Sequence, residues 1–229
     1  MTARMNFEME LELLHNRLSD MGEHVENTID QVVCALESDD AEQIKALMNG
    51  DRVIDDMEKE IEAKCLSLIT RQQPVARDLR MVSAALKVVT DIERIGDQTA
   101  DIAELAERNQ GQAIYHIAKA MPALIREAKD MVHRAVDAFI QNDGKAAASI
   151  IEMDDVVDDL FNQVKDEVVG ILRDENVLDE NSGKKTDPDC LVDVLMIAKY
   201  LEKIGDHAVN ICEWAIFRET GAIASVRLL

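Results

Sequence analysis

Acidic residues spaced four positions apart recur in this chain of 229 residues. Residues four apart lie on one face of an α-helix, so each pair would point two side chains in the same direction. Clustered oxygen ligands suit hard cations such as magnesium, manganese, calcium and iron, and spacing alone does not choose among them. The candidate metal ligands are Asp51, Asp55, Glu93, Asp97 and Asp101 in the first half of the chain, and Asp154, Asp158, Glu202, Asp206 and Asn210 in the second half.

The apolar neighbours of these acids indicate that the acids are partly buried. Glu93 and Asp97 fall beside Val82 and Leu86, at the margin of the apolar stripe of the expected helix. Like charges four apart are destabilising on a helix, and more so when partly buried, so a divalent or trivalent cation would offset the repulsion. The alternative is that they are solvated acids in a chain that has 46 of them. Their recurrence at matched places in both halves favours a metal site.

Long amphipathic helices are expected to position these side chains. Apolar residues recur at intervals of three and four, as at Ile29, Val32, Val33 and Leu36. The predicted helices span residues 5–37, 41–70, 75–108, 112–141, 144–174 and 188–219. In the fourth helix, Pro122 predicts either a later start or a kink. The fold class is therefore all-α.

An internal repeat divides the helices into two similar halves. Residues 18–69 align with residues 121–172 at a shift of 103, and after a longer loop in the second half the shift becomes 109. Short connections between long helices make neighbours antiparallel. We therefore predict two tandem antiparallel three-helix bundles, at residues 1–109 and 112–219, followed by a C-terminal tail at 220–229.

Composition excludes several classes of function. Acids outnumber bases 46 to 25, and a net charge of -21 repels nucleic acids and anionic membrane surfaces. No apolar run approaches the roughly 18 residues of a spanning helix, so direct membrane insertion is not expected. The four cysteines form no C-x-x-C pair, which is typical of a reducing, cytoplasmic setting. Without a P-loop, a Gly-rich dinucleotide motif or a Ser-His-Asp arrangement, the chain is interpreted as a non-enzyme.

Both halves carry Glu-x-Ile-Gly-Asp, at residues 93–97 and 202–206. A glycine inside a helix costs roughly 1 kcal/mol relative to alanine, so Gly96 and Gly205 predict the close approach of a neighbouring helix or a ligand. With the Asp-x-x-x-Asp pair at residues 51–55 and its match in the second half, these motifs make the chain resemble the PhoU family, regulators of bacterial phosphate uptake.

The resemblance covers about residues 8 to 219 and carries several implications. It implies two three-helix bundles with metal clusters on their surface, built from the acidic pairs named above. Because Asn210 takes the place of the charge at Asp101, the two clusters can differ in affinity or nuclearity. PhoU proteins are not enzymes. They are thought to restrain a high-affinity phosphate ABC transporter, whose ATPase is the expected partner, and to relay its state to a sensor histidine kinase.

Two other functions stay open at this point. A di-iron carboxylate oxidase would need Glu-x-x-His on each of two helices, and Glu12-Leu-Leu-His15 is the one match that fits the pattern. A structural dimerisation protein would use its apolar stripes and 11 methionines for packing alone, without a metal site. An elongated amphipathic bundle also suggests a homodimer.

Overall fold

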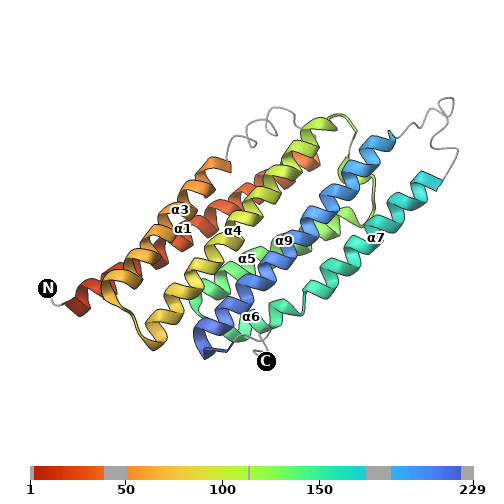
Figure 1. The fold of residues 1–229 in the computed structure, drawn as a ribbon. Helices are drawn as coiled ribbons and strands as arrows, with labels where there is room; N and C mark the ends of the chain where they lie inside the picture. Colours follow the sequence, from red (N-terminus) through yellow and green to blue (C-terminus); the bar gives the residue numbers. More distant parts are fainter. Residues whose placement is uncertain (1–2, 39–50, 113, 174–186, 223–229) are drawn as a thin grey trace.

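The molecule is an elongated bundle of long helices that run along a common direction (Figure 1). The computed structural model describes residues 3–38, 51–112, 114–173 and 187–222, and every regular element in those ranges is helical. This confirms the all-α class. The elements are α1 (Ala3–Ser38), α3 (Asp51–Gln72), α4 (Ala76–Arg108), the short 3-10 helix η1 (Ile114–His116), α5 (Met121–Gln141), α6 (Gly144–Ile151), α7 (Asp154–Arg173) and α9 (Pro188–Thr220).

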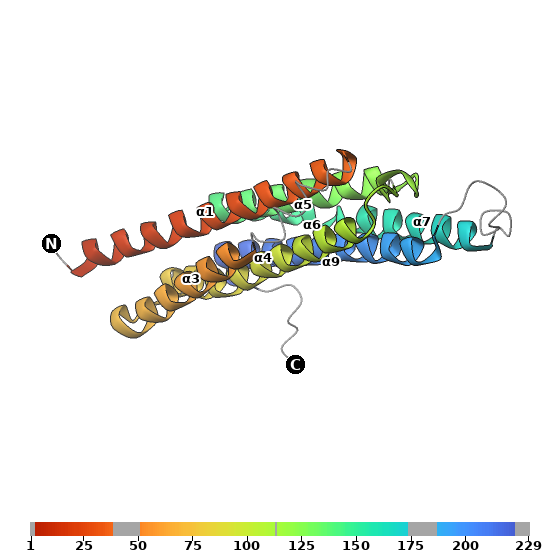
Figure 2. The ribbon, with the colours of Figure 1, turned by 90° about the horizontal axis from the view of Figure 1, so that it is seen from above.

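The two halves form bundles that lie side by side. Helices α1, α3 and α4 pack against one another in the first half, and α5, α6 and α7 pack with α9 in the second. The halves meet along two seams, one where α4 lies against α9 and another where α1 lies against α5 (Figure 2). The α4–α9 seam is the most extensive contact between any two helices, so the third helix of each half forms the centre of the molecule.

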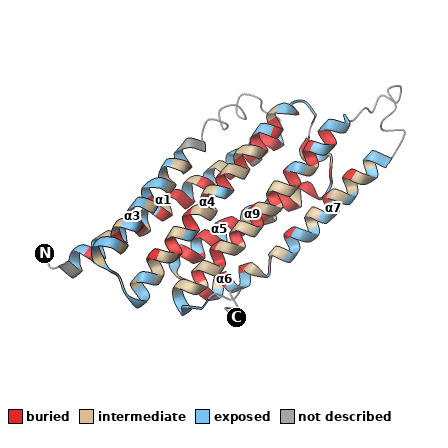
Figure 3. Cartoon of the chain, viewed as in Figure 1, coloured by how far each residue is buried: buried red, intermediate tan, exposed pale blue. Residues whose placement is uncertain are grey.

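Buried apolar side chains fill the space between the helices, while the outward faces of α3 and α7 are exposed (Figure 3). On α4 the buried positions repeat at three and four, as Val82, Ala85, Val89 and Ile92 show. The core is continuous across both halves. The described part of the chain contains no helix long and apolar enough to span a bilayer.

Charged pairs line the α1–α5 seam in a pattern set by the repeat. His133 Nδ1 lies 2.7 Å from Glu26 Oε2, and Lys129 Nζ lies 2.6 Å from Asp30 Oδ1. Because Lys129 matches Glu26 and His133 matches Asp30 at the shift of 103, the two pairs are related by the pseudo-symmetry of the halves. A hydrogen bond with Glu26 raises the pKa of His133 above its ordinary value.

The helix boundaries agree closely with prediction except in two places. The fourth helix starts late, at Met121, which confirms the first of the two outcomes expected from Pro122. The single helix predicted over 144–174 is wrong, because α6 ends at Ile151 and α7 begins at Asp154. Between them the Met153 N–H donates to the Ile150 carbonyl at 2.9 Å, a tighter turn than the α-helix allows. Residues 41–50 of the predicted second helix lie outside the described residues.

A methyl group at Gly22 should destabilise the seam between the halves. An added Cβ there would lie 2.5 Å from Val136 Cγ1, and a β-branched side chain cannot easily turn away. We expect Gly22→Ala to lower the free energy of unfolding by about 1–3 kcal/mol. In urea unfolding, Gly170→Ala is the matched control, because nothing lies within 4 Å of its Cβ, and it should instead gain up to about 1 kcal/mol. Equal effects of both variants would contradict the close packing at Gly22.

Candidate metal centre

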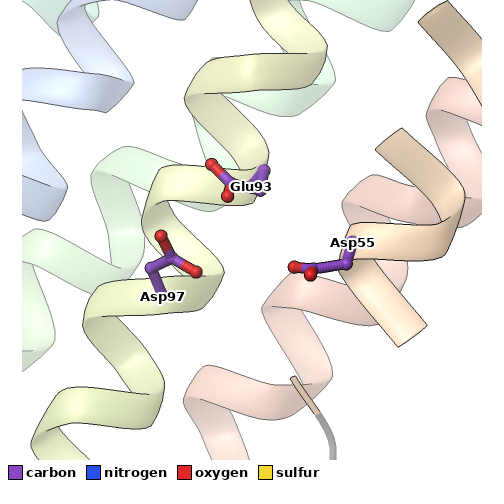
Figure 4. Close-up of side chains that lie close together, drawn as sticks. All are labelled: Asp55, Glu93 and Asp97. Carbon is purple, nitrogen blue, oxygen red and sulfur yellow. The ribbon is translucent and has the colours of Figure 1, made fainter. Parts of the chain in front are cut away.

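Three carboxylates converge where α3 packs on α4. Asp55 projects from α3 toward Glu93 and Asp97, which lie one turn apart on α4 (Figure 4). One oxygen from each of the three side chains lies within 4.8 Å of the others, a spacing at which a single cation could contact all three. Among the described residues, this is the group of acids, histidines or cysteines that meets that spacing.

Glu93 is the least exposed member of this group. Its side chain is 15% exposed, and its buried Oε2 accepts no hydrogen bond. Arg94 Nε lies 3.4 Å from that oxygen, but the Arg94 side chain is itself 56% exposed. Burial, and then the charge of Asp97, raise the pKa of Glu93 to about 7. A buried carboxylate oxygen that accepts no hydrogen bond from the protein is typical of a metal ligand. The three residues present therefore fit a hard cation.

The duplicated glycines allow the helices to come close enough for this convergence. A Cβ on Gly96 would lie 2.8 Å from Ile54 Cδ1 on α3, immediately beside Asp55. In the second half a Cβ on Gly205 would lie 3.3 Å from Val157 Cγ1 on α7, beside Asp158. The expected close approach at both positions is confirmed, and the approaching group is the neighbouring helix.

The acids of the second half also gather, but less tightly. Burial and then the charges of Asp206, Asp158 and Glu202 raise the pKa of Asp154 to about 6. Burial, followed by Glu202 and Asp206, also raises the pKa of Asp158. Within the described ranges, however, these acids do not bring three ligand atoms within 4.8 Å of one another. The repeat therefore places four carboxylates together in the second half without the convergence seen in the first.

Two lysines pair with Glu202 and Asp206, the two acids that α9 contributes to the second half. Lys199 Nζ donates to both oxygens of Glu202, at 2.6 Å each. Lys203 donates to Asp206, and its Nζ lies 3.5 Å from Glu202 Oε2. Sequence reasoning missed Lys199, although its spacing of three from Glu202 was visible.

The remaining candidate ligands lie at the seam between the halves. Asp101 hydrogen-bonds with Tyr200 of α9, and burial is the main cause of its raised pKa. The Asn210 amide donates to Asp91 Oδ1 of α4 at 3.0 Å. These two contacts are related by the shift of 109, which matches Asp91 with Tyr200 and Asp101 with Asn210. The structure thus assigns both side chains a contact across the α4–α9 seam, which the matched positions in the sequence could have indicated.

Asp91 also receives a second contact that the sequence did not indicate. His207 Nδ1 lies 2.9 Å from Asp91 Oδ1. Asp51 is the first residue of α3, but its side chain lies outside the described residues, so its part in the site stays a prediction.

Comparisons with known proteins agree with this architecture. The model of the PhoU domain matches the chain twice, at residues 18–106 and 122–215. A phosphate-specific transport system accessory protein PhoU homolog from Clostridium acetobutylicum is 36% identical over 220 residues, covering 96% of each chain.

Two solved structures are also similar. The crystal structure of PhoU from Pseudomonas aeruginosa has a TM-score of 0.82 at 28% identity, and covers 94% of this chain and all of that one. The phosphate transport system regulatory protein PhoU from Streptococcus pneumoniae has a TM-score of 0.84 at 25% identity, and covers 96% of this chain and all of that one. This chain belongs to the PhoU family. Its members are named as accessory and regulatory proteins of phosphate transport rather than enzymes.

Removing the Glu93 charge should stabilise the protein in a pH-dependent way when a chelator keeps metal away. The folded state holds a proton on Glu93 up to about pH 7, whereas the ordinary value is 4.5. Stability therefore falls as pH rises from 4.5 to 7, and the penalty is fully present above 7. We expect Glu93→Gln to raise the free energy of unfolding by on the order of 1–3 kcal/mol at pH 8 and to change it little at pH 4.5.

Urea unfolding at the two pH values would measure this difference. Glu60→Gln is the matched control, because Glu60 is 62% exposed and pairs with Arg17 at the surface. That variant should show no gain at pH 8. A loss of stability for Glu93→Gln at both pH values would instead mean that the Glu93 carboxylate supports the fold.

Proposed function

We propose that this protein is a metal-binding cytoplasmic regulator of phosphate homeostasis. In this proposal it restrains a high-affinity phosphate ABC transporter through contact with the transporter ATPase, and it relays the state of the transporter to a sensor histidine kinase. Membership of the PhoU family supports the regulatory part. The proposal includes a homodimer, for which Met5, Met9 and Leu13 provide about half-exposed apolar side chains on one face of α1, and which light scattering would test.

The convergence of Asp55, Glu93 and Asp97 is the observation that carries the metal part. The three residues would supply an all-oxygen ligand set, which suits iron, manganese or magnesium. A bound cation would satisfy Glu93 Oε2 and offset the mutual repulsion of the three charges. Since the ligands come from α3 and α4, the ion would also join two helices of the first half.

The oxidase alternative receives no support from the surroundings of His15. Burial and then the charge of Arg218 lower the pKa of His15. A guanidinium close to His15 repels a metal cation, so Glu12 and His15 do not sit in a setting that suits a di-iron site. The purely structural alternative is separated from the proposal by a binding measurement.

Isothermal titration with Mn²⁺ should detect binding that depends on the three carboxylates. Asp55→Asn or Asp97→Asn should each weaken binding by roughly tenfold or more, because each removes a charged ligand. Asp56→Asn removes the same charge from a neighbouring side chain that is 80% exposed, and it should leave affinity nearly unchanged. Elemental analysis of protein purified without a histidine tag would identify the ion. Equal losses in all three variants, or no binding at all, would contradict the site.

The regulatory partners can be tested by co-purification. The full-length chain should retain the ATPase subunit of the phosphate transporter and the sensor kinase when each is co-expressed with it. The ATPase subunit of an unrelated ABC transporter is the control and should not be retained. Failure to retain either expected partner, with the fold intact by circular dichroism, would remove the adaptor role and leave the metal site to be judged separately.

A further inference from the structure

Two of the matched positions at which the acidic clusters differ contact each other in both halves. Thr90 of the first half matches Lys199 of the second at the shift of 109, and Glu58 matches Phe161 at the shift of 103. Thr90 hydrogen-bonds with Glu58, whereas Lys199 lies 5.2 Å above the ring of Phe161. The first cluster therefore has an additional acid where the second has an ammonium group held against an aromatic ring.

This difference changes the surroundings of the matched glutamates. Glu202 receives the Lys199 ammonium on both of its oxygens at 2.6 Å, whereas Glu93 Oε2 has no hydrogen bond. The two side chains are almost equally shielded, at 12% and 15% exposure. Burial therefore does not distinguish Glu93 from Glu202. The difference between them is the lysine ammonium that is bound to both oxygens of Glu202.

The other nearby cations do not account for the contrast. Lys203 matches Arg94, and both lie beside their cluster, so this position is positive in each half. Lys59 lies 3.7 Å from Asp55 but is 66% exposed, and such a surface pair is screened by water. Lys199 is thus the cation that is specific to the second cluster and bound directly to Glu202, which is 12% exposed.

We infer that Lys199 is a specificity-determining residue, whose tethered ammonium group weakens metal binding at the second cluster so that the first half is the tighter site. This inference rests on the proposed metal-binding function. A metal ion that uses Glu202 must displace the ammonium from both carboxylate oxygens. Because the ammonium is joined to the same helix one turn away, it remains at high local concentration and repels the incoming ion.

A pair of titrations with Mn²⁺ isolates the second cluster. The first cluster is silenced with Glu93→Gln, and the full-length variant is compared with and without Lys199→Thr, which copies the residue found at the matched position in the first half. We expect Lys199→Thr to tighten the remaining binding by roughly tenfold, the scale of changes in residues that contact metal ligands. In the wild-type background, Thr90→Lys should weaken the first site.

Two controls separate charge from side-chain loss. Lys199→Arg keeps the cation and should leave binding weak. Lys165→Thr removes a lysine of the same half that bonds to Asn162, 2.7 Å away, and it should change little. Thermal unfolding followed by circular dichroism checks that each variant folds.

The outcomes distinguish this inference from the function on which it rests. No Mn²⁺ binding by the wild-type protein would overturn both. Wild-type binding that is lost with Glu93→Gln, together with no gain from Lys199→Thr, would overturn only the inference. An equal gain from Lys165→Thr would also overturn it, because the effect would then reflect overall charge.

Discussion

Carboxylates held at the edge of an apolar core are the constraint on which this structure depends. The acids lie where α3 meets α4 and where α7 meets α9, and water reaches them only in part. Because these charges are incompletely solvated, each cluster is stabilised by a compensating positive charge or by protonation of one acid. The fold brings the helices close through glycines at 96 and 205, and the same closeness that packs Ile54 and Val157 forces the acids together.

The two halves differ in how the repulsion among their carboxylates is offset. The second half supplies lysines from its own helix, and these bind Glu202 and Asp206 directly. The first half has a threonine at the position of Lys199, so Glu93 Oε2 has no hydrogen-bond donor, and Glu93 holds its proton up to about pH 7. Duplication thus provided two copies of one scaffold, and a few substitutions at the seam gave the copies different electrostatic characters.

Much of the fold could be predicted because it rests on periodicity and repetition. The helices around Glu93 and Glu202 were placed almost to the residue, since their apolar positions recur strictly and their ends carry proline or glycine. The break between α6 and α7 was missed because Glu152 and Met153 are ordinary helix formers. The local sign of a new helix was the pair of acids in the first turn of α7, Asp154 and Asp155.

The sequence indicated which residues belong to the candidate site better than it indicated how their side chains are arranged. Spacing of four placed Glu93 and Asp97 on one face, and in the structure Asp55 lies close to both. The direction of a long side chain depends on which partner it finds across a seam. Asn210 therefore bonds with Asp91 across the seam, a contact that its spacing does not indicate. The ion pair of Lys199 with Glu202 was likewise not predicted. Only the repeat shifts, applied to every polar position, would have exposed these pairings.

The charges of the α1–α5 seam affect which halves can pair with each other. Its two matched positions are acidic in the first half, as Glu26 and Asp30, and basic in the second, as Lys129 and His133. Exposed ion pairs of this kind add little stability, but they discriminate between partners. Two first halves from sibling molecules would meet acid against acid, and two second halves base against base. The seam therefore disfavours pairing between like halves and favours a first half packed against a second half.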